Sequence, residues 1–254
     1  MAQNPTAAHG GGSWPEEPPA VRGARHHDYK EAVSGVTHLL AALLSIAALV
    51  VLVVLAAQRA TVWHVVSFAI FGTSLILLYG ASTLYHMWPM HSNARNAFRR
   101  GDHIMIFLLI AGTYTPVCLV ALRGPWGWSI WGASLGIALV GISLKLGWIH
   151  DMELGENIRI PFYRHRWFST GLYLLMGWIG VIAFVPFQDA VGWGGLGWLA
   201  AGGIAYTLGA VAYGTKKPDL SPKWFGHHEL FHVLTMAGSF AHYWLMQRFV
   251  LSLP

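Results

Sequence analysis

Charged residues are so unevenly distributed along this 254-residue chain that long stretches contain none. Seven intervals of at least 18 residues lack Asp, Glu, Lys and Arg and are mostly apolar: 32–58, 60–94, 103–122, 124–144, 167–188, 190–215 and 230–247. A helix of about 20 apolar residues crosses the hydrocarbon core of a bilayer. The sequence therefore predicts an all-α integral membrane protein whose residues 26–254 form a seven-transmembrane-helix bundle.

Composition agrees with this class, because only 11% of the residues are charged, against roughly 25% in soluble domains. Residues 1–25 differ from the rest: they are rich in Ala, Gly and Pro without an apolar run, which predicts a disordered N-terminal tail. Cys118 is the single cysteine, so an internal disulfide is excluded, and we expect it to be a packing residue. Gly132 and Gly136, four residues apart, predict a close helix contact.

The basic residues predict the orientation of the bundle. The tail and the segments 87–102, 145–166 and 214–225 hold 13 Lys and Arg residues, whereas the loops on the other side hold 3. Because Lys and Arg are enriched in cytoplasmic loops, we expect a cytoplasmic N-terminus and a C-terminus outside. These basic residues sit in short loops, so the net charge of +5 is a topology signal and gives no reason to expect a nucleic-acid partner.

Polar residues gather at the predicted cytoplasmic ends of several spans. His228 and His232 open the last interval, and their spacing of four places both side chains on one face of a helix. His86 ends the second interval, four residues after Ser82, and Asp102 immediately precedes the third. Side chains from three separate stretches are thus predicted to meet in one layer of the membrane.

Such a set suits a metal ion. Two histidines four residues apart are a common half of a divalent metal site, usually occupied by zinc. Three neutral imidazoles leave a fourth zinc position open to water, and a carboxylate that is not a ligand can accept that water's proton. Two other interpretations stay open: a histidine pair on a solvated helix end, and an interfacial Asp102 that pairs with Arg99 or Arg100.

Other polar residues have less definite roles. Glu31, Ser34 and His38 are spaced three and four apart and form one polar stripe on the first predicted helix. His103 directly follows its acidic neighbour, so the two side chains leave the helix in different directions. We therefore expect His103 to support the site or the fold and not to be a ligand. His242 lies about 21 Å along its helix from the first of the paired histidines at 1.5 Å per residue, too far to share an ion with them.

These motifs together resemble those of a known family. The motifs are Glu31…His38, Ser82-x3-His86, the run from Asp102 to Pro116, and His228-x3-His232. They are similar to those of the hemolysin III family, which belongs with the progestin and adipoQ receptors, including the adiponectin receptors, and with alkaline ceramidases. Two departures lie in the first helix, where Ser34 replaces an expected Asn and Leu39 a common Gly.

The resemblance implies a fold, a cofactor and a set of site residues. The fold would be seven helices with a cytoplasmic N-terminus. Zinc would be bound by His86, His228 and His232, with Asp102 and a water completing the site and Ser82 close by.

Two function classes fit these features. The first is a zinc-dependent hydrolase that cleaves an amide or ester of a membrane lipid or lipid-like substrate, with Asp102 as general base and Ser82 placing the water or the oxyanion. The second is a sensor, receptor or transport-like protein in which zinc is structural and joins the second and seventh helices. Pore-forming haemolysis is disfavoured, because no span has a continuous polar face. Short loops favour a bacterial inner membrane.

Overall fold

The computed structural model describes residues 19–88, 92–146, 166–221 and 223–254. Its helical elements, in chain order, are α1 (Pro19–Arg59), α2 (Val62–Met87), α3 (Ser92–Pro116), η1 (Val117–Ala121), α4 (Pro125–Leu146), α5 (Arg166–Trp178), η3 (Ile179–Ala183), α6 (Phe184–Thr215), α7 (His227–Leu245) and η4 (Met246–Val250). The predicted tail, residues 1–25, lies mostly outside the described residues.

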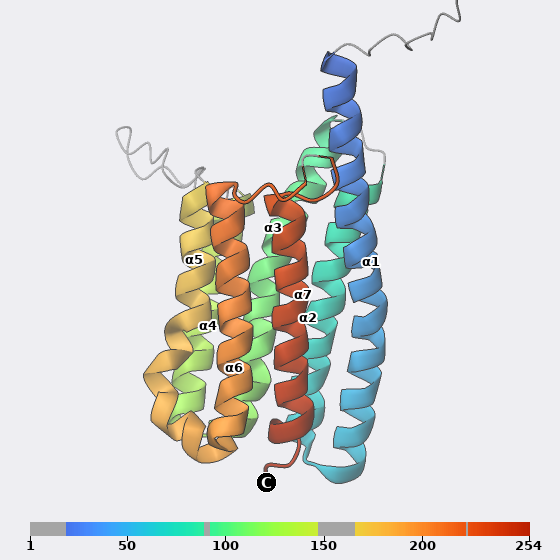
Figure 1. Ribbon diagram of the computed structural model, residues 1–254. Helices are drawn as coiled ribbons and strands as arrows, with labels where there is room; N and C mark the ends of the chain where they lie inside the picture. The colour runs from blue at the N-terminus through green and yellow to red at the C-terminus, as the bar shows by residue number, and fades with distance from the viewer. Residues whose placement is uncertain (1–18, 89–91, 147–165, 222) are drawn as a thin grey trace, which may run out of the picture.

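The α-helices stand side by side as an upright bundle, and successive helices run in opposite directions (Figure 1). Helix α1 packs along α2, α2 along α3 and α6 along α7. Between α5 and α6 the chain reverses direction through η3 and a break at Gly192, whose φ of 67° favours glycine. This reversal lies beside Asp189, the residue that separates two of the uncharged intervals.

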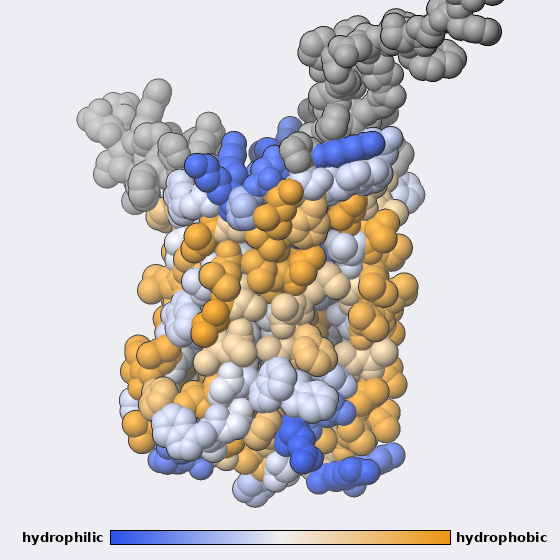
Figure 2. Space-filling view, viewed as in Figure 1, coloured by the Kyte–Doolittle hydropathy of each residue, from blue (hydrophilic) through white to orange (hydrophobic). Residues whose placement is uncertain are grey.

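Many large apolar side chains are exposed on the outside of the bundle. Five segments of the described residues are long and apolar enough to cross a membrane: Tyr29–Arg59, Val62–Met87, Ala94–Ala121, Pro125–Leu146 and Trp167–Thr215, the last of which contains both α5 and α6. Figure 2 shows the result as an apolar band between two hydrophilic rims. The prediction of an all-helical integral membrane protein is confirmed at this level.

The core of the bundle lies around α2 and α3. Phe68, Phe71 and Tyr79 of α2 are almost fully buried. At Gly112 the two helices approach so closely that an added Cβ would overlap the side chain of Ser74. This approach holds α3 against α2, the helix that carries His86.

The predicted contact at Gly132 and Gly136 is wrong. Among the described residues, no atom beyond the backbone of the helix itself lies within 4 Å of where a Cβ would stand at either glycine, so neither makes a close contact with another described helix. The packing face of α4 instead contains Ser134, Ala138 and Gly141, and the ring of Phe107 occupies the space where Gly141 lacks a side chain. The spacing of the two glycines places them on one face of the helix, but it does not indicate whether that face points into the bundle or away from it.

Candidate metal centre

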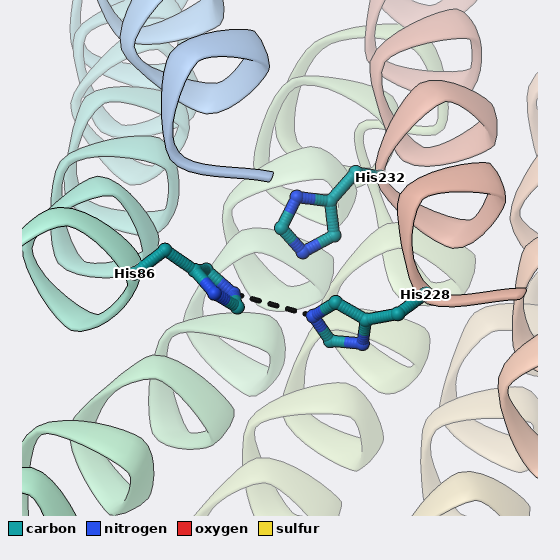
Figure 3. A group of neighbouring side chains, drawn as sticks. All are labelled: His86, His228 and His232. Atoms are coloured by element: carbon teal, nitrogen blue, oxygen red, sulfur yellow. Dashed lines mark hydrogen bonds between the residues drawn. The ribbon is translucent and has the colours of Figure 1, made fainter. Parts of the chain in front are cut away.

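Three histidines from two helices point toward one another at one end of the bundle (Figure 3). His86 comes from the last turn of α2, and His228 and His232 come from the first turns of α7. Each offers a ring nitrogen, and these three nitrogens all lie within 4.8 Å of one another. Nε2 of His86 is 3.2 Å from Nε2 of His228. The structure therefore brings together the three histidines that the sequence suggested as ligands.

A buried carboxylate fixes the start of α7. Glu229 accepts a hydrogen bond of 2.7 Å from the backbone N–H of Gly226, the residue that caps the helix. Its other carboxylate oxygen accepts a hydrogen bond of 3.0 Å from the hydroxyl of Ser34 on α1. With a side chain that is only 3% exposed, Glu229 ties the first turn of α7 to α1. The position and rotation of His228 and His232 follow from this turn.

In two of the histidines, the Nδ1 atom forms a hydrogen bond to an oxygen that can only accept a proton. Nδ1 of His86 lies 2.6 Å from the carboxylate of Glu31, which also accepts a hydrogen bond of 3.0 Å from Arg95. Nδ1 of His232 lies 3.3 Å from the backbone carbonyl oxygen of Ser34. Each Nδ1 is therefore the protonated nitrogen, which leaves Nε2 with its lone pair available to a metal. Partners of this kind orient metal-binding imidazoles and raise their basicity.

The polar stripe predicted on the first helix thus surrounds the histidine cluster. Glu31 and Ser34 make the contacts just described, and His38 stacks on the ring of His232 with centroids 3.6 Å apart and planes inclined by 10°. The edge of His38 also meets Tyr79, at a centroid distance of 4.9 Å. This stacking restricts the rotation of the His232 ring about its side chain.

The donor set fits zinc. Imidazole nitrogens bind zinc at about 2.0–2.1 Å, so two ligands of a tetrahedral ion lie roughly 3.3 Å apart. The 3.2 Å between the nitrogens of His86 and His228 matches this spacing, and the ring nitrogen of His232 lies within 4.8 Å of both. Three neutral nitrogen ligands also leave a fourth position without a protein donor, as in catalytic zinc sites.

Asp102 and Ser82 lie beside the cluster without belonging to it. Ser82 and Asp102 line the same cavity, and Ser82 and His86 are the two side chains that favour the charged form of the Asp102 carboxyl group. Among the described ion pairs, Asp102 makes none with Arg99 or Arg100. Asp102 instead lines the same cavity as His228 and His232, which argues against a purely interfacial role.

A cavity of about 600 Å³ begins at this cluster and extends through the bundle. The side chains of Asp102, Ser82, His228 and His232 line one end of it, and the remaining lining is mostly apolar. Its size lies within the range of small-molecule sites in proteins. Any ion bound by the histidines would therefore adjoin a space that an apolar molecule can fill.

Two other histidines for which the sequence predicted no part in metal binding contact backbone carbonyl groups. Nδ1 of His103 donates to the carbonyl oxygen of Arg99 at 2.7 Å, in agreement with the structural role expected for it. His242 lies apart from the cluster, with Nε2 3.3 Å from the carbonyl oxygen of Leu199. Sequence reasoning missed Glu229, although a glutamate three residues after a helix-capping residue is a recognisable signal.

The helical bundle with its exposed apolar side chains and its histidine cluster defines an integral membrane protein with a candidate metal site at one end. Comparison with known proteins then gives the family: the model of the Haemolysin-III related family matches residues 26–243. The chain belongs to that family, as its motifs suggested.

Relatives support this assignment. The chain is 34% identical over 225 residues to the Hemolysin-3 homolog of Bacillus subtilis, a match that covers 89% of this chain and 96% of the relative. It is also 34% identical over 212 residues to Hemolysin-3 of Bacillus cereus, covering 83% of this chain and 87% of that protein. A more distant relative, the adiponectin receptor protein of Drosophila melanogaster, is 26% identical over 191 residues, or 69% of this chain and 40% of the receptor. We accordingly place the protein in the bacterial plasma membrane.

Proposed function

We propose that this protein is a zinc-dependent membrane hydrolase that cleaves an amide or ester bond in a lipid-like substrate. The observation that carries the proposal is the meeting of three elements at one place: three convergent histidine nitrogens, a neighbouring carboxyl–hydroxyl pair, and an apolar cavity. A structural zinc site needs a fourth protein ligand, and the described histidine group contains three.

Each residue of the site has a separate role in the proposed reaction. Zinc bound by three imidazoles would supply a Lewis acid and lower the pKa of a water ligand to about 7. Asp102 accepts the proton of the attacking water and later returns it to the leaving amine or alcohol. Ser82, which lines the same cavity, orients that carboxyl group and places the water or the oxyanion. Glu31 and Ser34 fix the orientation of the imidazole rings of His86 and His232 through hydrogen bonds to Nδ1.

The cavity suits a substrate that enters from the bilayer. Some of the residues that line it are also exposed on the flank of the bundle, on α5, η3 and α6: Trp178, Val181, Phe184 and Trp193. The wall of the cavity and the surface of the bundle thus share residues on α5, η3 and α6, and we propose that the cavity opens to the lipid there. An acyl chain lying in the membrane could enter there without passing through water, and its polar head would stop at the histidines.

Hydrolysis by the purified protein tests the proposal. Protein in detergent should release fatty acid from ceramide-like amides or from ester lipids, lose this activity after treatment with a chelator, and recover it when zinc is restored. Recovery is the control, because chelation alone could act by unfolding the protein. Failure to hydrolyse any lipid amide or ester, with zinc bound and the fold intact, would reject the hydrolase.

We also propose that all seven apolar intervals span the membrane, with α5 and α6 as separate spans and α7 as the last. The supports are the reversal of the chain between α5 and α6 and the 13-to-3 distribution of Lys and Arg. The histidine cluster then lies near the cytoplasmic face. A C-terminal reporter that is active only outside the cytoplasm should be active, and the same reporter at the N-terminus should be silent. The reverse pattern would contradict both the topology and the depth of the site.

A further inference from the structure

Trp178, the last residue of α5, makes a hydrogen bond to the neighbouring helix α6. Its indole Nε1–H donates to the hydroxyl oxygen of Thr207 at 3.0 Å. The direction of this bond is fixed, because an indole N–H can only donate. The Thr207 hydroxyl donates its own proton to the carbonyl oxygen of Gly203 at 2.7 Å. A side chain of α5 is therefore bonded to a side chain of α6, and the two helices stand side by side in Figure 1.

This hydrogen bond lies in the wall of the cavity. Trp178 and Thr207 both line the cavity, and 41% of the Trp178 surface is exposed. Val181 and Phe184, which follow along the chain, also line the cavity and are also exposed. The bond between Trp178 and Thr207 thus belongs to the stretch of wall in which the proposed opening to the lipid lies.

The surroundings of the Trp178 indole leave it room to turn. On α6 its ring lies over Gly203, where a Cβ would stand 3.7 Å from the ring, so this glycine presents no side chain that would obstruct the ring. At Gly177, the preceding residue, no described atom beyond the backbone of the helix itself lies within 4 Å of where a Cβ would stand. There is therefore open space on that side of the end of α5.

The backbone around Trp178 is anchored, in contrast to its side chain. Here α5 gives way to the tighter helix η3, and Tyr114 of α3 bonds to the backbone on both sides of the change. The Tyr114 hydroxyl donates to the carbonyl oxygen of Gly177 at 2.8 Å and accepts from the backbone N–H of Gly180 at 3.0 Å. Movement is thereby restricted to the side chain of Trp178, and exposed side chains change rotamer rapidly.

We propose that Trp178 is the gate of the cavity. The gate is closed when the indole is bonded to Thr207, and it opens for a lipid chain when this bond breaks and the ring turns away from Gly203. A closed gate separates a chain in the cavity from the surrounding lipid, as lids do in other enzymes. The inference rests on the proposed function in so far as both place a lipid chain in this cavity and its entrance between α5 and α6.

A gate has a kinetic signature that a binding residue lacks. The chain passes a gate when it enters and again when it leaves, so loosening the gate raises the association and dissociation rate constants by the same factor and leaves Kd unchanged. A residue that only contacts the bound chain changes Kd, mainly through the dissociation rate constant. Stopped-flow fluorescence with a fluorescent fatty acid and the zinc-loaded, detergent-solubilised full-length protein measures both rate constants.

Two variants remove the hydrogen bond from opposite sides. Thr207→Val keeps the shape of the side chain without its acceptor, and Trp178→Phe keeps an aromatic ring without its N–H. Each should raise both rate constants by about three- to tenfold, the usual effect of one hydrogen bond on an equilibrium. Because both substitutions break the same bond, the double variant should be no faster than either single variant.

Thr215→Val is the matched control. It removes another hydroxyl of α6 that donates to the carbonyl four residues earlier, at 2.8 Å, but Thr215 lies outside the cavity lining. Both rate constants should equal those of the parent.

The gate would be overturned by an unchanged association rate constant in Thr207→Val and Trp178→Phe, by an equal increase in Thr215→Val, or by a parent that binds no fatty acid. Because a fatty acid contains no bond for the enzyme to cleave, these outcomes are independent of hydrolysis. Rate constants that respond to Trp178 and Thr207 in a protein that hydrolyses no lipid would keep the gate and reject the hydrolase. Unchanged rate constants in a protein that hydrolyses lipid would reject the gate alone.

Discussion

Purified protein with His232 replaced by Ala should contain little zinc, whereas the parent should contain about one ion per chain. The substitution leaves two of the three convergent nitrogens, which is too few for a stable site. Because the metal binds only the folded arrangement, it stabilises the parent by about 2.7 kcal/mol when free zinc is 100 times Kd. Chelation should therefore lower the melting temperature of the parent by several degrees and leave that of His232→Ala nearly unchanged. Metal analysis and melting curves on the same preparations measure both effects.

Two further variants calibrate this result. Glu31→Gln keeps all three ligands but weakens the acceptor for Nδ1 of His86, so zinc affinity should fall by about 10- to 100-fold without loss of the site. His227→Ala removes a histidine from the same helix end that does not belong to the cluster, and its zinc content should equal the parent's. A protein carrying both His228→Ala and His232→Ala that still bound a full equivalent of zinc would show that the ion lies elsewhere.

Asp102→Asn should separate chemistry from metal binding. The substitution preserves the size of the side chain and its ability to form hydrogen bonds but removes the base. Zinc content and melting temperature should stay close to the parent's, because Asp102 is not among the grouped ligands. Hydrolysis of a lipid amide should fall by roughly 10²–10⁴, the usual contribution of general acid–base catalysis. The measurement is turnover per zinc-loaded protein.

The same variant distinguishes the enzyme from a sensor or transport-like protein. In the latter, zinc would only join α2 to α7, and Asp102→Asn would change stability modestly with no effect beyond that loss. Hydrolysis that persists unchanged in Asp102→Asn with zinc retained would exclude Asp102 as the base. A lipid cavity by itself does not decide between the two, since a lipid sensor also needs one.

The histidine cluster could be predicted from sequence for a physical reason. Placing an ionisable side chain within a membrane costs free energy, so such residues are few and occur where they have a function. Their positions along the apolar intervals then indicate their depth in the membrane. His86, His228 and His232 fall at matching ends of their intervals, and the structure brings them together. The stripe of Glu31, Ser34 and His38 could be located in the same way, but its partners required knowledge of which helices are neighbours.

Other features depended on packing that sequence spacing does not specify. The four-residue spacing of Gly132 and Gly136 identified one face of α4, but both glycines face outward. Hydrogen bonds among the hydroxyl groups of Tyr79, Ser239 and Tyr206 join residues that are far apart in sequence, and no local pattern relates them. Which residues of α5 and α6 line the cavity likewise depends on how those two helices lie together.

An ion held by the three histidines is expected to keep one coordination position that is free of protein ligands and directed toward the cavity. Anomalous diffraction from crystals of the zinc-loaded protein at the zinc absorption edge tests it most directly. We expect one peak about 2.0–2.1 Å from a nitrogen of each of the three histidines, with a non-protein oxygen as the fourth ligand next to Asp102. A peak at any other residues, or a fourth ligand supplied by the protein, would contradict the claim.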